Sequence, residues 1–228
     1  MKPISRTKVE AFLNCPRCFW LDQVAGVKQP AGFPFNLNSA VDHLFKNEFD
    51  RYRGGSEVPP RLAREGLAFI PAAHPELGTW RSNFKGVRVV HAATGMTVFG
   101  AIDDLWRDDA GRHYVVDYKA TSKNDEVNLD AGWQGGYKRQ VEFYQWLLRG
   151  KGLEVADTAW FVYANGIRGE EPFDDILRFR TKIIPYEGSD AWVEQALVDL
   201  KACLLLEKAP QGAEDCEFCR YVEEASRW

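Results

Sequence analysis

Gly100-Ala-Ile-Asp103 and Val115-Val-Asp-Tyr-Lys119 are the two stretches that decide the fold of this 228-residue chain. Alternating side chains predict a strand over Thr97–Arg107, and a second strand follows at Val115–Lys119. The residues between them, Asp108-Asp-Ala-Gly111, are a typical turn sequence that ends in a glycine able to adopt positive φ. We therefore expect an antiparallel hairpin.

This hairpin brings two acidic side chains together. A turn centred on Ala110 makes Asp103 and Asp117 direct partners, and Lys119 shares the face of Asp117. Like charges that face each other destabilise a sheet, and a shared divalent cation relieves the repulsion. Asp104 competes with Asp103 for this role, because a register shift of one residue exchanges their faces. The sequence therefore predicts a functional acidic site on the sheet.

Composition bounds the class of protein. With 45% hydrophobic and 13% aromatic residues, the chain can bury a sizeable interior, and we expect one folded unit. The net charge of -4 and the pI of about 5.7 argue against a nucleic-acid grip over the whole surface, although a local basic groove stays open. Neither an export signal nor a long apolar run is present, so we expect a cytoplasmic protein that does not enter a membrane.

Hydrophobic periodicity predicts the other elements. The N-terminal region is expected to be helical, with a capping box at Thr7-x-x-Glu10 and a second helix that begins at Pro16. Further helices are expected over 38–52, 137–148 and 189–206, and further strands over 87–91, 158–164 and 175–184. The segment 54–86 has no period and is interpreted as a long connection with at most short elements. This order indicates an α/β sheet covered by helices.

The acidic residues and their neighbours resemble the PD-(D/E)xK nuclease superfamily. The similarity is to its RecB-like branch, which includes CRISPR-associated RecB-type exonucleases and AddB-type helicase-nuclease subunits. The matching positions are Gly100-Ala-Ile-Asp103, Asp117-Tyr118-Lys119, the pair Gln140 and Tyr144, and the upstream histidine His43. The resemblance implies a restriction-endonuclease-like core, in which helices flank a central mixed β-sheet, and a single nuclease domain over 1–228.

The resemblance also implies a catalytic metal. Mg²⁺ or Mn²⁺ would be bound by the side chains of His43, Asp103 and Asp117 and by the backbone carbonyl of Tyr118, which are ligands that suit these ions. Lys119 would orient the attacking water or stabilise charge in the transition state. On the periodicity of its helix alone, His43 is a surface residue, and only the resemblance makes it a ligand. Gln140 and Tyr144 would act with the catalytic residues from the next helix.

Two Cys-x-x-Cys units lie almost a chain length apart, at Cys15 with Cys18 and at Cys216 with Cys219. In the resembling branch, one N-terminal and three C-terminal cysteines bind a four-iron cluster that joins the two ends. This chain departs from that pattern, because its fourth ligand would have to be Cys18. We expect a cap formed by 1–35 and 207–228, with three alternatives for the thiols: a [4Fe-4S] cluster, a structural zinc, or reduced buried cysteines.

Positive charge near the acidic site suits a nucleic-acid backbone. The candidate contacts are Lys123, Lys138 and Arg139, together with the aromatic residues Trp133 and Tyr137, whose rings are able to stack on unpaired bases. Ordinary solvated surface and a core tryptophan explain these residues equally well.

These patterns lead to two hypotheses on function. The first is a metal-dependent deoxyribonuclease, more specifically an exonuclease on single-stranded DNA ends, in DNA repair, recombination or CRISPR adaptation. Its partners would be DNA and a helicase or CRISPR adaptation protein. The second is a catalytically silent DNA-binding or assembly module that keeps the fold and the cysteines. Retention of Asp103, Asp117 and Lys119 favours the first hypothesis.

Overall fold

The structure is a computed structural model that describes residues 2–30, 32, 36–169 and 172–228, without the side chain of Trp133. The chain forms two compact units. The central unit comprises 34–87 and 100–190, and the terminal unit comprises 1–33, 88–99 and 191–228. The single nuclease domain expected over 1–228 stays a prediction.

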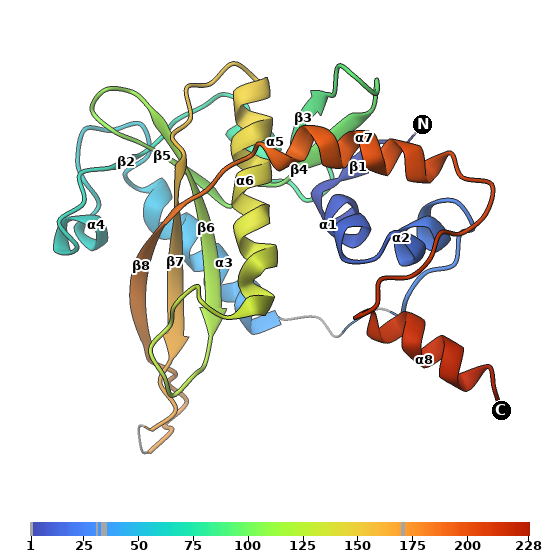
Figure 1. Ribbon diagram of the computed structural model, residues 1–228. Coiled ribbons are helices and arrows are strands. Elements are labelled where there is room, and N and C mark those ends of the chain that lie inside the picture. Colours follow the sequence, from blue (N-terminus) through green and yellow to red (C-terminus); the bar gives the residue numbers. More distant parts are fainter. Residues whose placement is uncertain (1, 31, 33–35, 170–171) are drawn as a thin grey trace. The chain divides into compact units, whose positions relative to one another are not determined.

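A five-stranded sheet is the framework of the central unit (Figure 1). Its strands, in spatial order, are β2 (Ile70–Pro71), β5 (Asp104–Arg107), β6 (His113–Thr121), β7 (Thr158–Gly166) and β8 (Phe179–Glu187). The β6–β7 pair is parallel and the other pairs are antiparallel. A parallel pair needs a crossover connection, and here the connection consists of the 3₁₀ turn η1 (Gly132–Gln134) and α6 (Gly135–Gly150). The predicted mixed sheet is confirmed.

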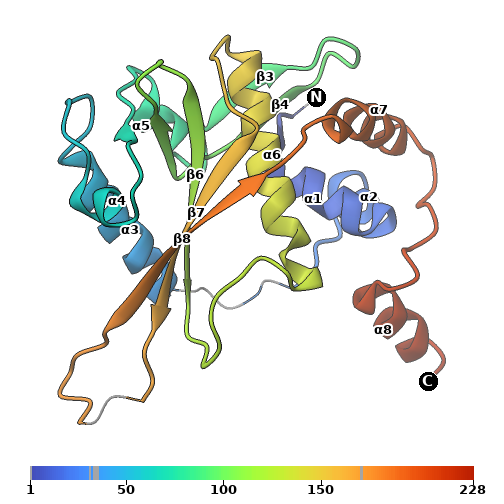
Figure 2. The same cartoon turned by 60° about the vertical axis from the view of Figure 1, so that its left-hand side comes forward.

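Helices cover both faces of this sheet (Figures 1 and 2). On one face, α3 (Asn36–Asp50) presents a stripe of Val41, Phe45 and Phe49 to the core. Alternate residues of β6, among them Tyr118, pack in the same cluster. The remaining residues of β6 therefore point to the opposite face, where α6 lies. Asp117 and Lys119 are on this α6 face.

The expected hairpin has the expected register. Asp104 pairs with Val116 and Arg107 pairs with His113, so the next position outwards sets Asp103 opposite Asp117. The continuous strand predicted over Thr97–Arg107 is wrong. It is divided into β4 (Thr97–Gly100), which belongs to a second sheet, and β5, and residues 101–103 are in neither strand.

Two glycines and a tryptophan explain where this strand is interrupted. Gly86 has φ +62°, and a Cβ built on it would lie 2.5 Å from the carbonyl oxygen of Gly100. Two backbones approach closely at this point, as only glycine allows. The amide of Ile102 donates to the carbonyl oxygen of Trp80 at 3.1 Å instead of continuing a ladder.

The terminal unit combines a small sheet with helices from both chain ends. Its strands are β1 (Ile4–Ser5), β4 and β3 (Val87–Val90), in the order β1-β4-β3. Its helices are α1 (Arg6–Asn14), α2 (Pro16–Gln23), α7 (Trp192–Leu204) and α8 (Glu217–Ala225). The predicted helix start at Pro16 is confirmed. None of the described helices is long and apolar enough to cross a lipid bilayer.

Other predicted boundaries differ by a few residues. The aperiodic segment 54–86 contains only the short elements α4 (Pro60–Arg64), β2 and α5 (Leu77–Trp80). The strand predicted from residue 175 begins at Phe179, because Asp174 and Asp175 have positive φ values of 45° and 55°. Aspartate is one of the few residue types that adopts this conformation readily, and it marks a turn rather than a strand.

Candidate active site and cysteine centre

The acidic site lies where β5 and β6 separate. Asp103 precedes β5 directly, and its Oδ2 accepts a hydrogen bond from the backbone N–H of Tyr118 at 3.0 Å. Asp117 is fully buried on the α6 face of β6. The carboxylate of Asp103 is therefore bound to the residue that follows Asp117, while 23% of its own side chain stays accessible. The structure brings both predicted carboxylates to the same end of the hairpin.

Lys119 links the acid pair to α6. Its Nζ forms an ion pair with Asp117 and lies 3.5 Å from Oε1 of Gln140. The same Nζ lies 4.5 Å from the ring centroid of Tyr137, a cation–π distance. Only 14% of the Lys119 side chain is exposed. The ammonium group is thus held between a carboxylate, an amide oxygen and an aromatic face.

Gln140 and Tyr144 continue this arrangement along α6. They are one helical turn apart, and Nε2 of Gln140 donates to the hydroxyl of Tyr144 at 3.1 Å. The Tyr144 ring lies directly on Gly100, where an added Cβ would be 2.6 Å from the ring. The glycine of the Gly100-Ala-Ile-Asp103 stretch therefore makes room for the aromatic ring of α6.

Asp104 has a different environment from Asp103. Its fully buried carboxylate forms ion pairs with Arg53 and Arg81, each at 2.8 Å. It also accepts a hydrogen bond from the Tyr118 hydroxyl at 2.5 Å. Burial, together with the charge of Asp104, raises the pKa of Tyr118 well above its usual value. These contacts fix β5 and the α3 end to β6, and they leave Asp103 as the accessible acid of the two.

We expect Asp104→Asn to lower the free energy of unfolding by about 1.5–3 kcal/mol, because it weakens two charged hydrogen bonds and leaves Arg53 and Arg81 with the more exposed Asp50 as their counter-charge. Asp103→Asn should cost less than about 1 kcal/mol, since an asparagine oxygen can still accept from the Tyr118 amide. Urea unfolding of the two variants measures this contrast. Equal losses would contradict the structural role of Asp104.

A further acid and a further lysine, which the sequence patterns did not single out, lie near Asp103. The Nζ of Lys46 on α3 is 2.8 Å from Asp42 and 3.4 Å from Asp103. Burial would lower the pKa of Lys46, but the charges of Asp103 and Asp42 raise it. Burial and the charge of Asp103 raise the pKa of Asp42. Their spacing of four residues is common on helix surfaces, so the sequence held no specific signal for them.

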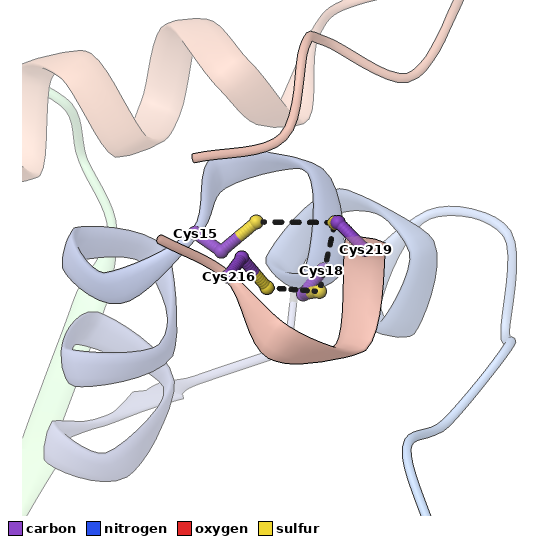
Figure 3. Close-up of side chains that lie close together, drawn as sticks. All are labelled: Cys15, Cys18, Cys216 and Cys219. Atoms are coloured by element: carbon purple, nitrogen blue, oxygen red, sulfur yellow. Dashed lines mark hydrogen bonds between the residues drawn. The ribbon is translucent and has the colours of Figure 1, made fainter. Parts of the chain in front are cut away.

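The four predicted cysteines converge in the terminal unit (Figure 3). Their Sγ atoms all lie within 4.8 Å of one another. The neighbouring sulfur atoms are 3.6–3.7 Å apart, in the pairs Cys15–Cys219, Cys18–Cys216 and Cys18–Cys219. The fifth cysteine, Cys203, is buried on α7 and points its Sγ to the carbonyl oxygen of Pro16 at 3.8 Å.

Both cysteine pairs lie at the N-terminus of a helix. Cys15 is the N-cap of α2 and Cys216 is the N-cap of α8, and the second cysteine of each pair follows three residues later, in the first helical turn. Backbone N–H groups at helix N-termini favour thiolates. Burial opposes ionisation of Cys15, but the N–H groups of Cys18 and Ala213 lower its pKa to about 7.

Close packing holds the two helix starts together. A Cβ on Gly212 would lie 2.8 Å from Sγ of Cys219, so the loop before α8 passes directly over the sulfur atoms. Nearby, Arg17 of α2 forms an ion pair with Glu223 of α8 at 2.7 Å. The predicted joining of the N- and C-terminal segments by four cysteines is confirmed as an arrangement of side chains.

Comparison with known proteins assigns the family. The model of the PD-(D/E)XK nuclease superfamily matches residues 3–223. The chain belongs to this superfamily. The crystal structure of SSO0001 is similar, with 17% sequence identity and a TM-score of 0.40, and the match covers 97% of this chain and 84% of that chain. A comparison with curated proteins finds none that matches.

The signature of the superfamily is consistent with the acids already described. Its name specifies an Asp or Glu, any residue and a Lys, which Asp117-Tyr118-Lys119 provides, and an earlier Asp, for which Asp103 is the candidate. Membership at this level does not distinguish the RecB-like branch, so that finer assignment stays a prediction.

The structure leaves His43 on the solvent side of α3, where its side chain is exposed. Its neighbour Asp42 points towards the Asp103 region through Lys46. The ligand roles of His43 and of the Tyr118 carbonyl stay predictions.

The predicted nucleic-acid contacts of the PD-(D/E)XK chain have different surroundings. Tyr137 packs against the Lys119 ammonium, and Nζ of Lys138 lies 5.5 Å from the ring centroid of Tyr186. Arg139 is half-buried near Gly135, and Lys123 is exposed. Trp133 belongs to η1, but its side chain is outside the described part of the chain. Binding of nucleic acid by these five residues stays a prediction.

Proposed function

We propose that this PD-(D/E)XK protein is a metal-dependent deoxyribonuclease that hydrolyses phosphodiester bonds through Asp103, Asp117 and Lys119. The observation that carries the proposal is the position of the Lys119 ammonium, held between the buried Asp117 carboxylate and Gln140, on the strand whose Tyr118 amide donates to the Asp103 carboxylate. A solvated Asp-x-Lys ion pair would not need a buried acid, a second acid hydrogen-bonded to the backbone of the same strand, and a supporting helix.

The donor set suits a hard divalent cation. Asp103, directly before β5, and Asp117 of β6 supply carboxylate oxygens at the same end of the hairpin, and oxygen is the ligand type that Mg²⁺ and Mn²⁺ prefer. We propose these two acids as the principal ligands, with His43 and the Tyr118 carbonyl as additional ones. When bound, such a cation polarises a phosphoryl oxygen and acidifies water.

The protein side chains position the substrate around this site. Lys119 places a positive charge where negative charge develops on the phosphoryl group, and its burial strengthens that interaction. Gln140 and Tyr144 fix the direction of the ammonium, because the amide oxygen faces Lys119 while the amide nitrogen donates to the tyrosine hydroxyl. Their role is to orient Lys119 and the phosphate.

We propose in addition that the four cysteines hold a metal centre. Sulfur atoms around one tetrahedral zinc ion, with bonds of about 2.3 Å, lie about 3.8 Å apart. Three of the separations among Cys15, Cys18, Cys216 and Cys219 are 3.6–3.7 Å, and all lie within 4.8 Å, which supports a single ion. Resemblance to the RecB-like branch supports a [4Fe-4S] cluster, in which each thiolate binds a different iron and the sulfur atoms lie farther apart.

The substrate is proposed to be single-stranded DNA that is degraded from its ends, in repair, recombination or CRISPR adaptation. A helicase or a CRISPR adaptation protein is the proposed protein partner, in the cytoplasm.

The test is degradation of end-labelled linear single-stranded DNA by the full chain with Mg²⁺, with Mn²⁺ and with chelator alone. A circular single strand of the same sequence is the matched control. Loss of the linear strand, metal dependence and survival of the circle are expected. Cleavage of the circle would show an endonuclease instead of the proposed exonuclease. Cleavage in chelator would contradict the proposed need for a divalent cation. Binding without cleavage under every metal would favour the catalytically silent DNA-binding module.

A further inference from the structure

The α6 face of the central sheet carries further cations beyond Lys119. Directly opposite residues on neighbouring strands share a face, and the register of β6, β7 and β8 therefore defines rows across the sheet. Two successive rows on the face of Asp117 are Lys119–Tyr163–Lys182 and Thr121–Asn165–Arg180. Two further cations, Lys182 and Arg180, thus follow the candidate catalytic lysine on one surface.

A pocket opens between these rows and the start of α6. Its empty space of about 300 Å³ is partly open to solvent. Lys119, Lys123, Tyr137 and Tyr163 are among its lining residues. Burial raises the pKa of Tyr163 to about 12, so its hydroxyl stays protonated and is able to donate a hydrogen bond. Two ammonium groups and a hydroxyl donor are the chemistry of a phosphate site.

The segment that carries Lys123 is held in place by the sheet. Asn165, which is 8% exposed, accepts from the Lys123 amide at 2.8 Å and donates to the Lys123 carbonyl at 3.1 Å. Next to it, Ser122 donates to the carbonyl of Gly166 at 3.0 Å. A cation on a fixed backbone loses less conformational freedom when it binds a ligand. Asn165 therefore acts as a positioning residue for Lys123.

The cations on β8 are accessible to a ligand. Arg180 is exposed. Lys182 contacts Glu126 at 2.6 Å and the carbonyl of Val127 at 3.2 Å, but the Glu126 side chain is 80% exposed. Exposed ion pairs of this kind contribute little, so a phosphate can replace Glu126 at small cost. Arg180 and Lys182 are two residues apart on β8, which separates them by about 7 Å. Successive phosphates in an extended single strand of DNA have a similar spacing.

We propose that Lys123, Arg180 and Lys182 form a phosphate track, which binds the backbone of the DNA strand next to the bond that is cut. The proposal rests on the proposed nuclease function, because that function places the scissile phosphate at Lys119. Hydrolysis itself involves none of the three track residues. They bind the flanking strand in the ground state and in the transition state alike.

The test is the salt dependence of DNA binding in chelator, measured by fluorescence anisotropy with a short fluorescein-labelled oligothymidylate. Each phosphate contact on a single strand contributes about 0.7 to the slope of log K against log salt. Arg180→Ala should lower the slope by about 0.7, and Arg180→Ala/Lys182→Ala by about 1.4. Arg112→Ala is the matched control, because this arginine is exposed and ion-paired at the other end of β6. Its slope should equal that of the wild type.

The outcomes separate this proposal from the nuclease proposal. If the wild type cleaves DNA and the folded track variants keep the wild-type slope of log K against log salt, the phosphate-track proposal is wrong and the nuclease proposal stands. Reduced slopes without cleavage under any metal support the track and overturn the nuclease. Wild-type protein that does not bind the oligonucleotide overturns the track. If cleavage occurs, the double variant should raise KM and leave kcat unchanged, as expected for uniform binding; thermal melts confirm that each variant is folded.

Discussion

Lys119→Met is expected to lower kcat for metal-dependent DNA cleavage by at least about 10²-fold, the loss seen when one preorganised group that stabilises transition-state charge is removed. The methionine keeps most of the apolar length of the side chain and removes the ammonium that contacts Asp117 and Gln140. Initial rates on end-labelled single-stranded DNA, at saturating Mg²⁺ or Mn²⁺, measure the effect.

A loss of activity alone would be ambiguous, because Lys119→Met also leaves the fully buried Asp117 carboxylate without its counter-charge. This should cost about 3–5 kcal/mol of stability. The double variant Asp117→Asn/Lys119→Met removes both charges, so it should regain most of that stability and stay inactive. Lys151→Ala, which removes a lysine from a partly exposed ion pair with Glu76, should keep both wild-type properties. Wild-type kcat in Lys119→Met would end the assignment of Lys119 to the reaction.

Cys216→Ser is expected to abolish metal binding at the four-cysteine centre and to lower the stability of the terminal unit by several kcal/mol. The binding free energy of structural thiolate-metal sites is on the order of 10 kcal/mol or more, and it is available only to the folded chain. Metal analysis, sulfide analysis and an absorption spectrum after anaerobic purification identify the occupant, and thermal unfolding measures the stability.

Cys203→Ala is the matched control, because Cys203 is buried in the same unit but lies outside the four-sulfur group. This variant should keep the full metal content, and its free energy of unfolding should fall by about 1 kcal/mol because one buried thiol group is removed. A brown wild type with iron and sulfide identifies the cluster, and a colourless one with one zinc identifies the single ion. Wild-type protein without metal would leave four reduced thiols and contradict the metal centre.

The hairpin and its register were predictable because the information is local. The turn centred on Ala110 and the alternation on either side fix the pairing of Asp104 with Val116, and hence the position of Asp103 opposite Asp117. The interruption before Asp103 was not predictable in this way. One bent strand and two strands of different sheets show the same alternation, and the interruption depends on the approach of Gly86 to Gly100, which are distant in the sequence.

The candidate site was recognised from its motif residues, whereas its supporting residues were missed. The pattern located Asp117, Lys119, Gln140 and Tyr144, which the structure joins through a series of contacts. Lys46 escaped notice because a lysine four residues after an aspartate is an ordinary feature of exposed helix surfaces. Arg180 and Lys182 of β8 were missed for a related reason. They share a surface with Lys119 because β8 pairs with β7, and that pairing cannot be read from the local sequence.

The position of the cysteines in the chain has a consequence for biosynthesis. A ribosome makes a chain in the direction from its N-terminus to its C-terminus, so the segment 34–190, which includes the central sheet, is complete before Cys216 and Cys219 exist. The thiolates of Cys15 and Cys18 must then stay reduced while nearly two hundred residues are added. Insertion of a metal into the proposed four-cysteine centre would therefore be the closing step of maturation, and a nascent protein that emerges into an oxidising compartment would lose two of the proposed ligands before their partners arrive.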